Sequence, residues 1–150
     1  MAEQQYVIFQ LEKETYGIDI AKVWEIITPK AVTKVPHAAS FIEGIINLRG
    51  KVIPVIDLRK RFGLSSGEHR HSERIVIIEI EGNTLGMTVD GVSEVLQINT
   101  EAVEAPPSVV TDVDSDYLAG VAKLEDRLII LLNLDKVLTH QEKQVLGEVC

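Results

Sequence analysis

The feature that most constrains the fold of this chain is an internal repeat. Residues 6–27 align without a gap on residues 75–96 at a shift of 69, and seven of the 22 aligned positions are identical. Residues 41–62 align on residues 117–138 at a shift of 76. The difference between the two shifts places a seven-residue insertion in segment 106–116, where a surface loop can absorb it. The chain is therefore predicted to contain two small units of one design.

Both copies have the pattern of β-strands, and the clearest example is a hairpin. Gly44 to Leu48 and Val52 to Leu58 are apolar runs whose Ile and Val residues favour strands. Arg49-Gly50 joins the two runs, and Gly50 can adopt the positive φ of a tight turn. Arg49 is therefore expected at the tip of a stiff support, with its charge outside the core.

Two small barrels packed side by side are the expected architecture. Each unit supplies about five short strands, and a closed barrel of that size removes exposed sheet edges. A unit of about 65 residues is marginal alone, so an apolar interface should join the pair. Asp57 is expected to cap a short helical turn. The expected boundaries are a first barrel over 14–66 and a second over 73–132, with an N-terminal strand 5–12 and a C-terminal helix 133–147 packing on both.

The charge is unevenly distributed. The formal net charge of −8 argues against a nucleic-acid-binding protein, which needs a positive surface. Residues 1–75 carry 11 Lys and Arg against 9 Asp and Glu, about +2, whereas residues 76–150 carry 4 against 14, about −10. This asymmetry serves solubility, or it steers a different protein partner to each half.

The sequence predicts a cytoplasmic protein without direct membrane insertion. No apolar run approaches the roughly 20 residues of a membrane span, and the first ten residues lack the features of a signal peptide. The single cysteine, Cys150, cannot form an internal disulfide, which agrees with a reducing compartment.

No motif of an enzyme, cofactor or metal site is recognised. The serines lack a nucleophile-elbow pattern, and His69 and His71 lack a third metal ligand. The alternating acidic residues of segment 112–116 lack the Gly and Glu of a calcium loop, so a solvated acidic loop is expected. Trp24 is interpreted as a core residue rather than a contact residue.

Four stretches resemble, in order, the CheW family of chemotaxis coupling proteins: YGIDIAKVWEI, FIEGIINLRGKVIPVIDLRKRFG, DGVSEVL and YLAGVAKLEDRLIILLNLDKVL. The resemblance covers nearly the whole chain. It implies an all-β fold of two five-stranded SH3-like barrels with short helices. It also implies a non-enzymatic adaptor that couples methyl-accepting chemotaxis receptors to the histidine kinase CheA, is recruited to membrane receptor arrays, and gives receptors control of kinase autophosphorylation.

The resemblance further implies where the partners bind. The helical tip of the receptor is expected in a groove between the barrels, held by aliphatic anchors and one charged selector. The regulatory domain of CheA is expected to pair barrel to barrel with this protein. The implied receptor-binding residues are Ile20, Val23, Glu25, Asn47 and Arg49. The implied kinase-binding residues are Val32, Val103 and Val109.

Other interpretations remain open at this level. From spacing alone, Arg49 is as readily a solvated turn residue as the anchor of an interface. A coupling domain of CheV or CheA would require a fused receiver or kinase domain. A small ligand-binding or hydrolytic β-barrel would instead show a deep apolar pocket with convergent polar groups.

Overall fold

A computed structural model of the protein describes residues 3–12, 14–36, 41–61, 73–104, 118–124 and 127–136. Strands dominate these residues, which confirms the all-β prediction. The elements are β1 (Glu3–Leu11), β2 (Glu14–Asp19), η1 (Ile20–Lys22), β3 (Val23–Ile27), β4 (Ile42–Leu48), β5 (Lys51–Asp57), α1 (Leu58–Arg61), β6 (Arg74–Ile80), β7 (Asn83–Val89), β8 (Gly91–Asn99), η2 (Thr100–Ala102), β9 (Val103–Glu104), β10 (Leu118–Leu124), β11 (Arg127–Leu132) and η3 (Leu134–Lys136).

Two of the predicted helical segments can be compared with these elements. Asp57 caps α1 as expected, because its Oδ1 accepts a hydrogen bond of 3.0 Å from the backbone N–H of Arg59. The predicted C-terminal helix 133–147 overlaps the short 3-10 turn η3. Its remainder lies outside the described residues and stays a prediction.

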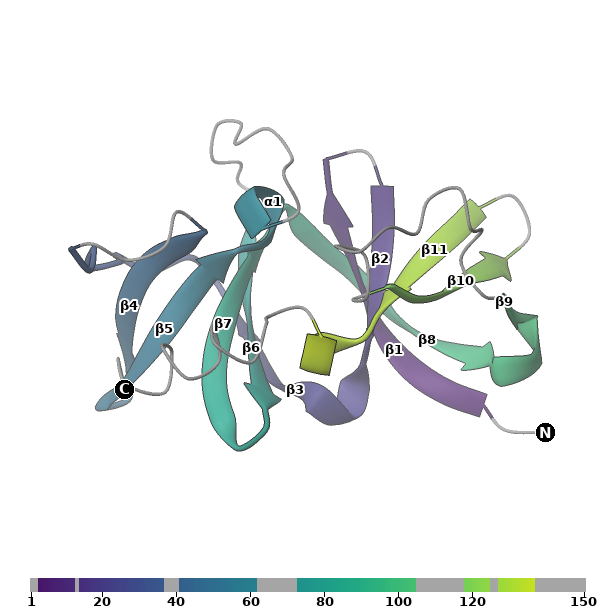
Figure 1. Ribbon diagram of the computed structural model, residues 1–150, viewed down its shortest axis with the longest axis horizontal. Helices are drawn as coiled ribbons and strands as arrows, with labels where there is room; N and C mark the ends of the chain where they lie inside the picture. The colour runs from purple at the N-terminus through teal and green to yellow at the C-terminus, as the bar shows by residue number, and fades with distance from the viewer. Residues whose placement is uncertain are drawn as a thin grey trace.

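The strands form two sheets that lie side by side along the long axis of the molecule (Figure 1). The first barrel has the strand order β3-β6-β7-β5-β4, and the second barrel has the order β8-β1-β2-β11-β10-β9. Each contains one parallel pair, β5 with β7 and β2 with β11, among antiparallel neighbours. The sequence repeat assigns each strand of the first barrel a counterpart in the second. Replacing every strand of the first barrel by its counterpart gives the order β8-β1-β2-β11-β10, which is the strand order of the second barrel without β9. The duplication is thus present in the fold.

The two barrels close in equivalent ways. In the first, the chain beyond β3 returns to β4, where Thr33 and Ile45 exchange backbone hydrogen bonds of 2.9 and 2.8 Å. In the second, β8 continues through η2 into β9, and Glu104 of β9 pairs with Val121 of β10. Ile45 and Val121 are 76 residues apart, as the repeat requires.

The predicted grouping of strands into 14–66 and 73–132 is wrong. The hairpin β6–β7 belongs to the first barrel, and the hairpin β1–β2 belongs to the second. β1 does not merely pack on the pair, because it lies between β8 and β2 in the sheet. A single residue, Asp90, links β7 to β8. Because the tightest common hairpin needs two loop residues, β8 cannot fold back on β7 and enters the other barrel instead.

The largest apolar cluster joins the two barrels, which confirms the expected interface. From β1 it takes Val7, Phe9 and Leu11, and from β6 it takes Val76, Ile78 and Ile80. The residues between them face the other way: Ile8 belongs to the cluster inside the second barrel, and Ile75 and Ile77 to the cluster inside the first. Both strands are therefore buried on two faces, which explains their continuous apolar sequences.

Phe9→Ala is expected to lower the free energy of unfolding by about 3–5 kcal/mol. Phe9 is fully buried and stacks on Tyr16 with ring centroids 5.8 Å apart. Because the cluster is shared, both barrels should unfold in one transition. The single tryptophan, Trp24, reports on the first barrel although Phe9 lies in the second. Urea titrations followed by Trp24 fluorescence and by far-UV circular dichroism should shift together; separate midpoints would contradict a shared core.

Candidate partner-binding surface

Arg49 lies at the tip of the predicted hairpin, which the structure confirms as β4–β5. Arg49 and Gly50 have φ values of 52° and 85°, so the two-residue turn is of type I′. The side-chain oxygen of Asn47 accepts a hydrogen bond of 2.8 Å from the backbone N–H of Gly50. Asn47 therefore holds the turn that presents Arg49, whose side chain is 73% exposed.

Arg49 forms a bidentate ion pair with Glu25 of β3. Its Nη1 donates to Glu25 Oε2 at 3.3 Å, and its Nη2 donates to Glu25 Oε1. The sequence predicted both residues as site members but not their contact, because 24 positions separate them. An ion pair this exposed contributes only about 0–1 kcal/mol to stability. Its main effect is to restrict the orientation of the guanidinium.

Ile20 and Val23 lie where the chain passes from the second barrel into the first. Asp19 caps the intervening turn η1, because its Oδ1 accepts a hydrogen bond of 2.9 Å from the N–H of Ala21. Ile20 and Val23 are half-buried and pack against the cluster between the barrels. Burial and then the Asp19 charge raise the pKa of Tyr6, so its phenol stays protonated at neutral pH. The expected groove between the barrels stays a prediction.

Exposed apolar side chains accompany the Arg49–Glu25 pair. Trp24 is 61% exposed, so its interpretation as a core residue was wrong. Strand β3 alternates, and Trp24 and Ile26 point outward while Val23 and Glu25 are half-buried. The indole N–H donates to Glu79 at 3.0 Å, and Lys51 Nζ lies 5.7 Å from the ring centroid.

Trp24, Ile26 and Val52 are functional candidates that the sequence reasoning missed. Ile26 is 40% exposed and lies on the same strand as Glu25. Val52 is 45% exposed and lies next to the turn that carries Arg49. Trp24 and Ile26 lie on the same exposed face of β3, and neighbouring exposed apolar side chains mark interaction sites. The alternation of β3 was the available signal, because it places Trp24 opposite the inward-facing Val23.

Trp24→Ser is expected to change the free energy of unfolding by no more than about 1 kcal/mol, because the indole covers little core surface. A buried Trp would cost about 3–5 kcal/mol on truncation. Chemical denaturation followed by circular dichroism distinguishes the two values. A loss in the higher range would mean that Trp24 supports the barrel rather than facing a partner.

The family model of the CheW-like domain matches residues 5–142 of this chain. The chain belongs to the CheW family. Chemotaxis protein CheW of Treponema pallidum is 36% identical over 149 residues, and that of Klebsiella aerogenes is 34% identical over 146 residues; each alignment covers 97% of this chain and 88% of the relative. The crystal structure of scaffolding protein TtCheW from Thermoanaerobacter tengcongensis superposes with a TM-score of 0.84 at 44% identity, covering 91% of this chain and 92% of that one. A scaffold or adaptor role in chemotaxis follows from this membership.

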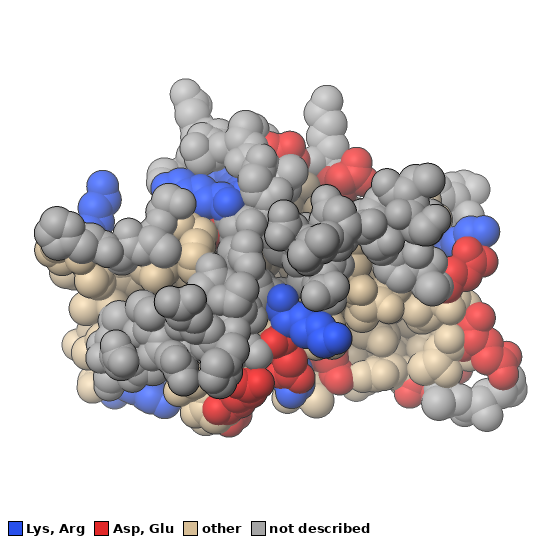
Figure 2. Space-filling model, viewed as in Figure 1, with Lys and Arg blue, Asp and Glu red and all other residues tan. Residues whose placement is uncertain are grey.

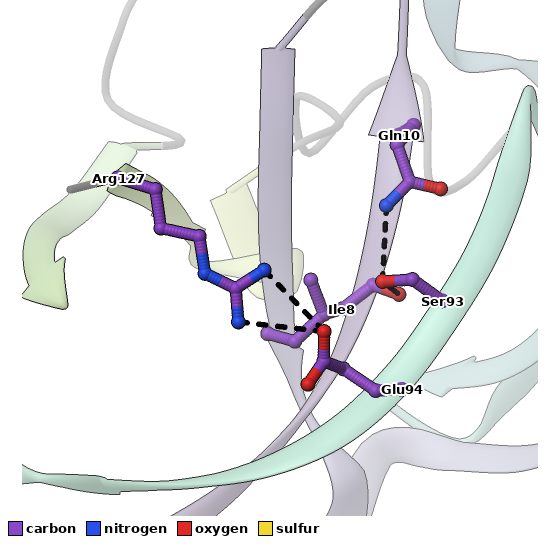
Figure 3. A network of polar contacts seen from close by, with 5 residues as sticks. All are labelled: Ile8, Gln10, Ser93, Glu94 and Arg127. Carbon is purple, nitrogen blue, oxygen red and sulfur yellow. Dashed lines mark hydrogen bonds and ion pairs between the residues drawn. The ribbon is translucent and has the colours of Figure 1, made fainter. Parts of the chain in front are cut away.

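The second barrel of this CheW-family chain carries a modified copy of the surface. Arg127 of β11 reaches Glu94 of β8, with both terminal nitrogens 3.3 Å from Oε2 (Figure 3). The repeat aligns Glu94 with Glu25, but it aligns Arg127 with Lys51 rather than Arg49. Val95 and Leu128, 48% and 58% exposed, align with Ile26 and Val52.

The copy differs from the original at the position of Trp24. Its counterpart Ser93 accepts a hydrogen bond of 3.0 Å from the side chain of Gln10 and donates one of 3.4 Å to the carbonyl of Ile8 (Figure 3). The aromatic side chain is therefore particular to the first barrel, whereas the acid–base pair is common to both.

Two of the three residues predicted to contact the kinase, Val32 and Val103, lie where the CheW-like barrels close. Val32 is half-buried against the cluster inside the first barrel, and Val103 is half-buried against the cluster inside the second. Their Cγ1 atoms lie 2.8 and 2.6 Å from the Cβ positions that Gly44 and Gly120 lack. The two valines are thus structural counterparts with a packing role. Val109 lies outside the described residues, and the kinase contacts remain predictions.

Two further findings concern only the part of the chain that the structure describes. None of its helices is long and apolar enough to cross a membrane. It also contains no group of three or more His, Cys, Asp or Glu side chains arranged to hold a metal ion. His69, His71 and Cys150 lie outside this part, as does the acidic segment 112–116.

Proposed function

We propose that this chain is a non-enzymatic adaptor that couples methyl-accepting chemotaxis receptors to the histidine kinase CheA, so that receptors control kinase autophosphorylation. The observation that carries the proposal is the Arg49–Glu25 pair, presented on a rigid turn beside the exposed Trp24. Membership of the CheW family supports it. An exposed guanidinium oriented by a carboxylate keeps further N–H donors for a polar partner.

The receptor side of the proposal uses the first barrel and the crossing at η1. Ile20 and Val23 are the aliphatic anchors, since each leaves part of its side chain exposed next to the core between the barrels. Arg49 is the charged selector, Glu25 orients it, and Asn47 holds the turn. An amphipathic helical tip fits this combination of apolar anchors and one charge.

On the kinase side, Val32, Val103 and Val109 are the proposed contacts, and Val32 and Val103 lie where the barrels close. Val103 belongs to β9, which ends the strand order of the second barrel. Val32 and Val103 both leave part of their side chains exposed at these closures, where another barrel can pack. By this contact the kinase joins the receptor-bound adaptor, which places the complex in the cytoplasm at membrane receptor arrays.

The charges support two different partners. In the described residues, the second barrel (β1, β2 and β8–β11 with η2 and Glu12) carries seven Asp and Glu against two Lys and Arg, a balance of −5. The first barrel (residues 23–36, 41–61 and 73–89) carries eight Lys and Arg against six Asp and Glu, a balance of +2. Both signs are visible on the face in Figure 2. Unlike fields steer different proteins to the two ends.

A reconstituted kinase assay tests the proposal. Purified CheA, a receptor signalling fragment and this chain are mixed in all pairs and together, and phosphate incorporation into CheA is measured. We expect receptor-dependent activation only in the complete mixture, and capture of each partner by the immobilised chain. If the chain captures neither partner, the coupling proposal is wrong.

A further inference from the structure

We propose that Arg59 and Asp90 are a positioning pair that fixes the angle between the two barrels. This inference rests on the proposed function, since a fixed angle matters for a protein that holds two partners at once on its pair of barrels. The pair is separate from the candidate contact residues on the surface. It acts through the placement of those residues relative to one another.

Asp90 contacts elements of both barrels. It is the residue at which the chain leaves β7 of the first barrel for β8 of the second. Its backbone N–H donates to the carbonyl of Gln10 at 2.9 Å, and its Oδ2 accepts from the backbone N–H of Glu12 at 2.5 Å. Its Oδ1 lies 3.3 Å from Nη1 of Arg59 in α1. The end of β1 in the second barrel is thereby tied to the helix of the first.

The charges at this crossing are buried. Arg59, Asp57 and Asp90 are only 3–4% exposed, and Arg59 Nε lies 4.0 Å from Asp57 Oδ1. Well-packed apolar residues often stabilise a protein as much as a buried ion pair does, because desolvation of the charges is costly. A buried pair instead favours one arrangement, since any other leaves its charges unpaired. At a crossing between barrels, that arrangement is their mutual orientation.

The other crossing between the barrels, at η1, carries an exposed ion pair instead of a buried one. Lys22 of η1 pairs with Asp135 of η3 at 3.7 Å, and both side chains are more than 40% exposed. The repeat aligns Asp135 with Arg59, where the charge is opposite, but it aligns Lys22 with Gly91 rather than with Asp90. Water screens the Lys22–Asp135 pair and weakens it. The Arg59–Asp90 crossing is therefore the one that holds the angle.

Distance measurements between the barrels test this directly. Nitroxide labels are attached at two exposed strand positions, Lys51 in the first barrel and Gln97 in the second, after Cys150→Ser removes the native thiol. We expect one narrow distance distribution in the parent protein, one at least twofold broader in Arg59→Met, and no change in Lys22→Met. A folded Arg59→Met protein with an unchanged distribution would overturn the proposal.

A second variant covers the possibility that Arg59→Met does not fold, since it removes a buried cation from beside two buried carboxylates. The double variant Arg59→Met/Asp90→Asn removes the cation and one of these charges together and keeps a side-chain oxygen for the N–H of Glu12. The same broadening is expected. A narrow distribution here would equally refute the positioning role.

The functional consequence is measured on unlabelled protein. In Arg59→Met/Asp90→Asn we expect binding to CheA alone and to the receptor fragment alone within twofold of the parent protein, with receptor-dependent activation reduced at least tenfold. Equal losses of binding and activation would indicate a merely structural role. If the coupling function itself were wrong, the parent protein would fail the kinase assay while the distance result would still stand.

Discussion

Arg49→Glu is expected to abolish receptor-dependent kinase activation in a protein that remains folded. The substitution places a carboxylate against Glu25 and removes the only cation of this pair. Because the side chain is largely exposed, the free energy of unfolding should change by no more than about 1 kcal/mol. Loss of a central Arg from an interface costs about 2 kcal/mol or more, which corresponds to receptor binding roughly 30-fold weaker. Titration with the receptor fragment and the kinase assay measure both effects.

Arg127→Glu is the matched control for this prediction. It makes the same charge change in the equivalent pair of the second barrel, where Arg127 faces Glu94. We expect receptor-dependent activation close to that of the parent protein. Similar losses in both variants would point to net charge rather than to the site, and full activation by Arg49→Glu would remove Arg49 from the candidate residues.

Gly44→Ala is expected to destabilise the protein by more than about 3 kcal/mol, at the upper end of single substitutions. Gly44 has a φ of +150°, and a Cβ atom there would lie 2.1 Å from the backbone oxygen of Thr33. The same oxygen accepts the hydrogen bond from Ile45 that helps to close the first barrel. The obstacle is backbone, so no side-chain rotation relieves it. Urea denaturation followed by Trp24 fluorescence measures the loss.

Gly50→Ala separates the clash from the effect of backbone conformation. Gly50 also has a positive φ, +85°, but no atom lies within 4 Å of its missing Cβ. Its replacement should cost only about 1 kcal/mol, the usual penalty for a non-glycine residue in this region. If Gly44→Ala proved no more harmful than Gly50→Ala, the close approach of Thr33 would not be a constraint on folding.

Local features of the fold and site could be predicted because neighbouring residues determine them. The β4–β5 hairpin follows from two apolar runs around Arg49-Gly50, and the α1 cap follows from Asp57. The apolar interface followed from size, because about 65 residues cannot bury a sufficient core alone. The pairing of Arg49 with Glu25 and the exposure of Trp24 could not be predicted in this way. Both depend on how β3 lies against strands distant in the sequence.

The sequence by itself determined that this protein is an internal duplication, with two copies of one strand pattern and with matching turns. Only the tertiary structure decided which hairpin joins which barrel, because an alignment of repeats contains no information on pairing between them. The single-residue link at Asp90 cannot reverse the chain, so β8 leaves the barrel of β7. Each barrel therefore takes its β1–β2 or β6–β7 hairpin from the other half of the chain, and neither half contains a complete barrel.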